Sequence, residues 1–249
     1  MDDELLRRAE DLSRRAGRTG SVTHTGFLTP AEAETLRLWA PRGCDCVTVF
    51  EGGRAEAERR CCFFLPDWMD PEDCDPSDEL RAIELTVRFG APGHRDVLGA
   101  ALALGIEREW LGDILIDGER VWLFCLPSVE RHLLDGLDHV GRWGAKTRAV
   151  PLSEVPAPKR ELRPVRFTVR SPRLDAVISG IFRVSRGTAA EAISEGLVQR
   201  NYLPCLKPDA QVQPGDVLSL RGKGKARVLD TDAGESRSGR QFIDAEIYQ

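Results

Sequence analysis

The residues with the most distinctive chemistry lie between Ser171 and Lys225, where basic side chains alternate with short polar ones. Arginine and lysine neutralise phosphate groups, while serine, threonine and asparagine form short hydrogen bonds to phosphate and 2′-hydroxyl groups. The pattern therefore indicates contact with a nucleic-acid backbone. The candidate contact residues are Arg173, Arg183, Ser185, Arg186, Thr188, Arg200, Asn201, Lys207, Arg221, Lys223 and Lys225.

The distribution of charge supports this interpretation, although the net charge of the 249 residues is −5. Residues 1–158 carry 19 Lys and Arg against 29 Asp and Glu, a charge of −10, while residues 159–230 carry 14 against 7, a charge of +7. The remaining residues carry −2. A basic module joined to an acidic one is typical of a chain that meets phosphates at one end. A basic face that merely contacts water is the alternative.

Two short helices and a strand-turn-strand unit must position these side chains. Leu174, Val177, Ile178 and Ile181 recur at helical spacing. Ser185 is placed to cap a second helix, which Gly196 ends. A short strand over 197–202 and a strand over 217–220 follow, with a tight turn at 214–216 and a basic, glycine-rich loop at 221–225.

This run resembles the S4 RNA-binding domain. The resemblance rests on Arg173-Leu174-Asp175, on Ser185 to Ala190, on Ile193 to Val198 and on Val212 to Leu218. Pro204-Cys205 departs from the family, which usually has a glycine-containing turn and a lysine there. The resemblance implies binding to structured RNA.

The region before it predicts a β-α-β-β-α-β order. Strands are expected over 81–89, 111–117, 121–126 and 146–152, and helices over 96–104 and 128–140. This is the plan of ferredoxin-like and RRM-like domains. The region is acidic and lacks the base-stacking aromatic signature, and Phe89, Trp122 and Phe124 are as compatible with the core as with base contact. We therefore expect this domain to contact protein or a small patch of RNA and not to hold single strands.

The fold class predicted from these patterns is α+β. Residues 1–75 are expected to form an N-terminal wing of helices and a hairpin, residues 76–155 the RRM-like domain and residues 160–230 the S4 domain. Residues 231–249 are expected to form a C-terminal tail, in which Gln241 to Tyr248 are compatible with a last strand.

The seven cysteines favour free thiols over a disulfide framework or a metal site. Five of them lie between Cys44 and Cys74 in CxC and CC spacings, without a nearby histidine, whereas zinc sites use CxxC or Cys/His pairs. No metal and no cofactor are expected.

His94-Arg95-Asp96 could cap a helix or form a second RNA contact at its N-terminus. The kinase catalytic loop that it resembles needs an asparagine at position 101, which is Ala101. The wider segment 93–100, with 104–109, 112–114 and Gly26 to Pro30, resembles YlmH-type S4-domain proteins of bacteria. That family has a wing, an RRM-like domain and an S4 domain. The resemblance implies binding to ribosomal RNA and tRNA on the large subunit, with links to the rescue of stalled large subunits carrying peptidyl-tRNA and to cell division.

Arg173 to Gly180 also resembles the catalytic aspartate motif of pseudouridine synthases, but only 74 residues follow Asp175. Residues 1–158 contain no G-x-G-x-x-G and no P-loop. We therefore expect a non-enzymatic protein, with an S4-targeted RNA-modifying enzyme and a cell-division adaptor as alternatives.

The expected partners are RNA and the large ribosomal subunit, and the protein is expected to be a monomer. The charged N-terminal segment does not resemble a secretory signal, and no apolar run approaches a membrane span. A cytoplasmic location without membrane contact is expected.

Overall fold

The computed structural model describes residues 2–158, 162–236 and 239–248. The chain folds into two compact units, Met1–Pro158 and Lys159–Gln249. The predicted start of the S4 domain, at residue 160, lies outside the described residues.

The first unit begins with two helices packed on a three-stranded antiparallel sheet of order β1-β3-β2. Thr29 caps the second helix, because its Oγ1 accepts the N–H of Glu32 at 3.3 Å and the Glu32 carboxylate accepts the N–H of Thr29 at 2.7 Å. The elements are α1 (Asp2–Thr19), β1 (Thr23–His24), α2 (Pro30–Gly43), β2 (Val47–Glu51) and β3 (Cys61–Leu65).

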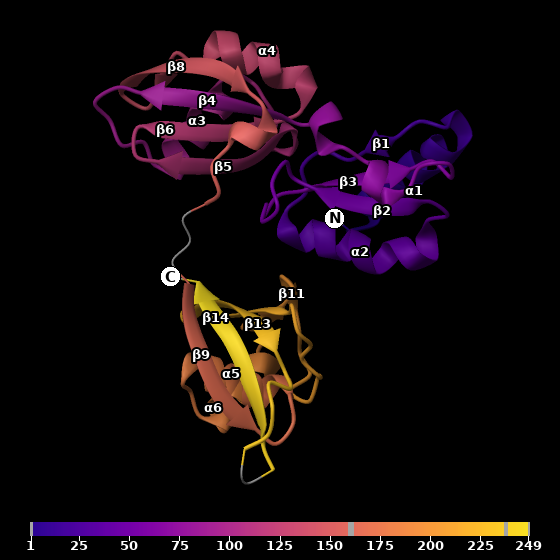
Figure 1. The fold of residues 1–249 in the computed structure, drawn as a ribbon, viewed down its shortest axis with the longest axis vertical. Helices are drawn as coiled ribbons and strands as arrows, with labels where there is room; N and C mark the ends of the chain where they lie inside the picture. The colour runs from indigo at the N-terminus through magenta and orange to yellow at the C-terminus, as the bar shows by residue number, and fades with distance from the viewer. Residues whose placement is uncertain (1, 159–161, 237–238, 249) are drawn as a thin grey trace. The chain divides into compact units, whose positions relative to one another are not determined.

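A second antiparallel sheet follows, with the strand order β5-β6-β4-β8-β7. Two helices cover one of its faces (Figure 1). The predicted elements are present in the predicted order, but the last helix ends at Gly136 and the last strand begins at Trp143. A two-residue strand that was not predicted, β7, lies between them. The elements are β4 (Arg81–Val87), α3 (His94–Ala103), β5 (Leu111–Asp117), β6 (Arg120–Cys125), α4 (Pro127–Gly136), β7 (His139–Val140) and β8 (Trp143–Val150).

The other face of this sheet packs on the N-terminal wing. Phe63 and Leu65 of β3 share one buried cluster with Trp122 and Phe124 of β6. Of the two roles that the sequence left open for Trp122 and Phe124, the structure therefore shows the core role. The boundary predicted at 75/76 does not separate two cores, because β3 is buried on both sides and joins the wing to the sheet.

Phe89, in contrast to Trp122 and Phe124, does not lie in the core. The strand ends at Val87, and the Phe89 side chain, two residues later, is 94% exposed. The alternation of apolar residues over 81–89 continues past the point where the backbone leaves the sheet.

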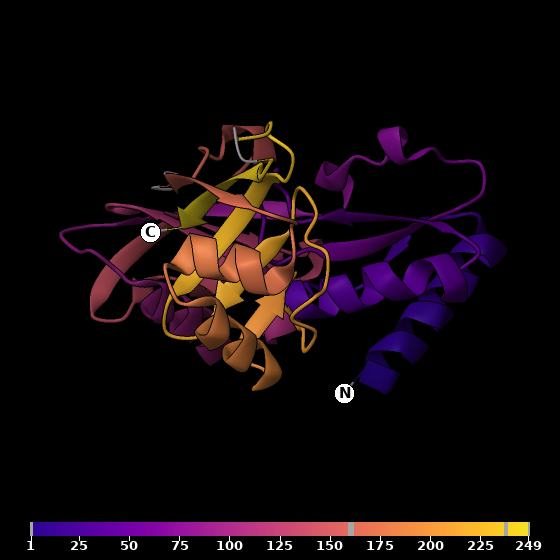
Figure 2. The ribbon, with the colours of Figure 1, turned by 90° about the horizontal axis from the view of Figure 1, so that it is seen from below.

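The second unit is a six-stranded sheet of order β11-β10-β12-β13-β14-β9. Two helices cover one of its faces, and Figure 2 shows both of them on the same side of the strands. The elements are β9 (Leu162–Val169), α5 (Leu174–Phe182), α6 (Arg186–Ser194), β10 (Val198–Arg200), β11 (Leu203–Pro204), β12 (Val217–Leu220), β13 (Gly224–Asp230) and β14 (Gln241–Tyr248).

The last strand, β14, belongs inside this sheet and not to a separate tail. It pairs with β13 on one side and, along its whole length, with β9 on the other. The compact unit therefore continues past residue 230, because without β14 two strands would lose their hydrogen-bonding partner.

Gly180 sets the distance between α5 and β9. A Cβ at this position would lie 2.2 Å from the Phe167 ring. Gly180→Ala is therefore expected to destabilise the second unit by about 1–3 kcal/mol, measured by urea denaturation.

Gly187→Ala is the matched control. Gly187 lies in the first turn of α6, and the nearest atom to an added Cβ is 3.8 Å away. Alanine in a helix is favoured over glycine by about 0.5–1 kcal/mol, so this variant should not lose stability. Equal stability of the two variants would contradict the packing argument.

Candidate nucleic-acid interface

Asp175, in the first turn of α5, holds two of the predicted contact residues together. Arg173 approaches its carboxylate at 3.2 and 3.3 Å, and Arg186 from the start of α6 approaches at 3.0 and 3.3 Å. Asp175 is only 5% exposed. Asp175 is the aspartate in the segment that resembles the pseudouridine synthase catalytic motif. In this structure its carboxylate joins the starts of α5 and α6.

The charge of Asp175 is stabilised by its partners. Burial raises the pKa of its carboxyl, but the hydrogen bonds and charges of Arg173 and Arg186 outweigh burial and hold the pKa below its usual value. The arginine side chains are 37% and 58% exposed. Each guanidinium has five N–H donors, and two are directed at Asp175, so the remaining donors can meet a ligand.

Backbone hydrogen bonds fix the loops that carry further predicted contact residues. Pro208 accepts the N–H of Asp175 at 2.9 Å, which sets Lys207 beside the start of α5. Leu197 accepts the N–H of Arg221 at 3.0 Å, and Leu206 packs near Gly196, so the turn after β12 adjoins the same loop. We call this surface the basic edge. It consists of Arg173, Arg186, Lys207, Arg221 and Lys223.

A groove of about 390 Å³ beside α5 adds two arginines that the sequence analysis missed. Arg170 follows β9 and Arg240 precedes β14, and both line the groove together with Arg186. Pairing of β9 with β14 brings them together from positions 70 residues apart. No local sequence signal predicts this approach.

Several predicted residues also take part in the fold. Ser185 caps α6 by accepting the N–H of Thr188 at 3.0 Å, and the two hydroxyl oxygens are 2.8 Å apart. Arg183 is exposed and ends α5 in the left-handed conformation. Their contact with RNA remains a prediction.

Buried Asp216 organises another group. It accepts the side-chain amide of Asn201 at 2.9 Å and pairs with Arg200 at 2.7 Å, while the Asn201 oxygen accepts the N–H of Val217 at 2.8 Å. Lys225 lies over the rings of Tyr202 and Tyr248, at 5.4 and 5.0 Å. These side chains hold the end of β10 against β12 and β13, so they are less available to a ligand than the basic edge.

In the first unit, His94 and Arg95 are exposed at the start of α3. The carboxylate of Asp96 accepts the N–H of Gly93 at 2.8 Å. The capping interpretation is therefore confirmed for Asp96, and a role for His94 and Arg95 in RNA contact remains a prediction.

The other distinctive motifs of the first unit hold the wing to the second sheet. Asp113 accepts a guanidinium N–H of Arg54 at 2.8 Å and the backbone N–H groups of Glu58 and Arg59 at 2.9 and 3.0 Å. Burial, and then the charge of Arg59, lower the pKa of Arg108 to about 10. Asp113 is buried, and the contacts of its carboxylate join the wing to the start of β5.

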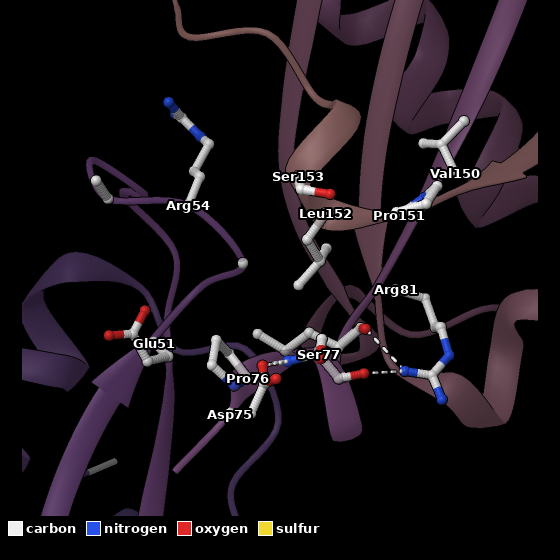
Figure 3. A pocket seen from close by; sticks show the side chains of 13 residues that line it. Glu51, Arg54, Asp75, Pro76, Ser77, Arg81, Val150, Pro151, Leu152 and Ser153 are labelled. Carbon is white, nitrogen blue, oxygen red and sulfur yellow. Dashed lines mark hydrogen bonds between the residues drawn. The ribbon is translucent and has the colours of Figure 1, made fainter. Parts of the chain in front are cut away.

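A pocket of about 770 Å³ lies along the same seam, between the wing and β4 (Figure 3). At its floor, Asp75 accepts the N–H of Ser77 at 2.8 Å, and Arg81 donates to the carbonyl of Ser77 at 2.7 Å. These polar groups at its floor are bonded to the chain itself.

The cysteines are free thiols. Cys61 and Cys62 face opposite clusters, as their adjacent positions on a strand predict, and burial raises the pKa of both thiols. Among the described residues, no group of three or more His, Cys, Asp or Glu is placed to hold a metal ion. Within the same residues, no helix is long and apolar enough to cross a membrane.

Part of the first unit matches a known family, and longer parts of the chain resemble two known proteins. Residues 71–154 match the sequence model of the family described as "Putative RNA-binding domain in YlmH". Ribosome-associated protein quality control protein P2 of Bacillus subtilis (strain 168) is 29% identical over 204 residues, which cover 82% of this chain and 79% of that protein. The solved structure of cell division protein ylmH from Streptococcus pneumoniae is 25% identical, with a TM-score of 0.51, and covers 61% of this chain and 93% of that chain.

Proposed function

This chain is a YlmH-type protein, and we propose that it is a non-enzymatic RNA-binding protein that acts on the ribosome. The observation that carries the proposal is the basic edge, whose solvent-accessible cations lie at two helix starts joined through Asp175 and in two loops of the second unit. Phosphate groups are the ligands that such a surface suits. Because ribosomes are cytoplasmic, the proposal includes a cytoplasmic location for this protein.

The two units take different parts in this proposal. The second unit is an S4 domain, supported by the helix pair, the turn at 214–216 and the position of the basic edge. The sheet of β4 to β8 is an RRM-like domain, supported by its order of elements and strands. The sheet face with Trp122 and Phe124 is covered by the wing, so this face of the domain is not accessible to RNA.

The finer proposal is that the protein binds structured ribosomal RNA and tRNA on the large subunit and rescues large subunits that carry peptidyl-tRNA. It is supported by the name of the Bacillus subtilis relative, which refers to ribosome-associated quality control. A role in cell division is the second candidate, supported by the name of the Streptococcus pneumoniae structure and by the acidic first unit.

Sedimentation with separated ribosomal subunits in a salt series tests the proposal. If about six phosphates are neutralised, the logarithm of affinity for the large subunit should fall against the logarithm of salt concentration with a slope of about −4 to −5. The small subunit serves as the comparison. A slope near zero, or equal binding to both subunits, would contradict the proposal, and binding to neither would favour a protein partner.

A further inference from the structure

The loop between β4 and α3, residues 88–93, exposes an aromatic ring on an unfavourable backbone. The Phe89 side chain is 94% exposed and its φ is +56°. A bulky residue in the left-handed region is an outlier, and holding one there costs conformational free energy. Glycine would remove both the strain and the exposed apolar surface. Phenylalanine at this position therefore points to a use for the ring outside the fold.

Neighbouring elements fix the loop in place. The backbone N–H of Phe89 donates to the Glu119 carboxylate at 3.1 Å. Gly90 packs against Trp143, since a Cβ at position 90 would lie 2.6 Å from the indole ring. The loop is therefore held between the β5–β6 turn and the start of β8, and the direction of the ring is built into the fold.

The surface around Phe89 is basic. Arg88 belongs to the same loop, and His94 and Arg95 follow it at the start of α3, all with exposed side chains. Arg142, also exposed, lies 5.0 Å from the centre of the Trp143 ring, against which Gly90 packs. The carboxylates of Glu119 and Asp96, which border the loop, accept the backbone N–H groups of Phe89 and Gly93.

We propose that Phe89 stacks on an unpaired RNA base, while Arg88, Arg95 and Arg142 neutralise the flanking phosphates. Single-stranded nucleic acid is bound by this combination of an exposed aromatic face and basic side chains that follow the backbone. Paired RNA buries its base faces, so the ligand of this loop is an unpaired nucleotide. The inference rests on the proposed RNA-binding function and assigns it a second contact, separate from the basic edge.

Binding of two labelled RNAs to the intact chain tests this assignment. The first is a fluorescein-labelled 12-nucleotide RNA without self-complementarity, and the second is a blunt 12-base-pair RNA duplex, both followed by fluorescence anisotropy. Stacking on one base corresponds to about 1–3 kcal/mol, so Phe89→Gly should weaken single-strand binding by roughly 5- to 150-fold. The duplex should bind as before.

Two further variants separate stacking from other effects. Phe89→Trp keeps an aromatic face and should retain single-strand affinity within about threefold. Leu102→Ala removes another exposed apolar side chain of the same unit, 40% exposed on α3, and should have no effect. Since stacking releases no counterions, Phe89→Gly should leave the salt slope unchanged.

The inference is overturned if Phe89→Gly binds the single strand as the parent does, if both RNAs lose affinity equally, or if the intact chain does not bind the single strand. Loss of duplex binding on charge reversal at the basic edge reports on the proposed function separately. A duplex that binds normally while Phe89→Gly has no effect on single-strand binding would refute this contact alone and direct attention to a protein partner for the ring.

Discussion

Reversal of three charges on the basic edge, with Lys207, Arg221 and Lys223 each changed to Glu, is expected to weaken binding to the large ribosomal subunit by roughly 100-fold or more at 0.1 M salt. Each lost phosphate contact should make the salt slope less negative by about 1. The slope of the triple variant should therefore be less negative than that of the parent by about 3. These side chains are exposed, whereas Arg186 pairs with Asp175 and Lys225 lies between two rings. The effect should therefore come from binding and not from misfolding.

The matched control changes the same amount of charge on α1, with Arg7, Arg15 and Arg18 each changed to Glu. These side chains are exposed in the first unit. Sedimentation should show little change for this control. If both triple variants lose affinity to the same extent, net charge alone accounts for binding and the basic edge is not a site. Circular dichroism of both variants checks that the fold is intact.

Most elements of the fold could be predicted because the helices and strands of this chain have clear apolar periodicities. The cap at Thr29, the opposite directions of Cys61 and Cys62, and the β-α-β-β-α-β order are local properties of the sequence. The place of β14 inside the sheet, and the shared core of wing and second sheet, depend on pairing across long sequence separations. Periodicity carries no information about such pairing.

Some features of the candidate interface could likewise be predicted from the sequence, and others depend on the fold. Charge and the S4-like motif indicated a candidate segment, yet residue type could not show which of its side chains are held by hydrogen bonds within the fold. Asn201 is bonded at both ends of its amide, while Lys207 and Arg221 stay exposed. Arg170 and Arg240 become neighbours only through the pairing of β9 and β14. Phe89 fits the alternation of its strand and still points to solvent, because the strand ends two residues earlier.

Asp175→Asn is expected to destabilise the second unit by about 1.5–3 kcal/mol at pH 7, the range for hydrogen bonds to a charged group. Asparagine keeps an acceptor for the N–H of Ala176 but loses the charge that Arg173 and Arg186 share. Both arginines are partly exposed and return to water in the variant, so no buried cation is left behind. Urea denaturation followed by circular dichroism measures the difference.

The pH dependence of that difference identifies its cause. The pKa of Asp175 is lower in the folded protein than the ordinary value, despite its burial, because the hydrogen bonds and charges of Arg173 and Arg186 stabilise the carboxylate. The carboxylate therefore contributes stability above an ordinary aspartate pKa of about 3.9, and this contribution is lost as the pH falls through the lower folded pKa. The gap between parent and variant should stay constant from pH 7 to about 5 and narrow below pH 4. Asp209→Asn, an exposed control in the same unit, should change stability by less than about 0.5 kcal/mol at pH 7. A gap for Asp175→Asn that persists undiminished at pH 3 would assign the loss to packing and not to the charge that organises the two arginines.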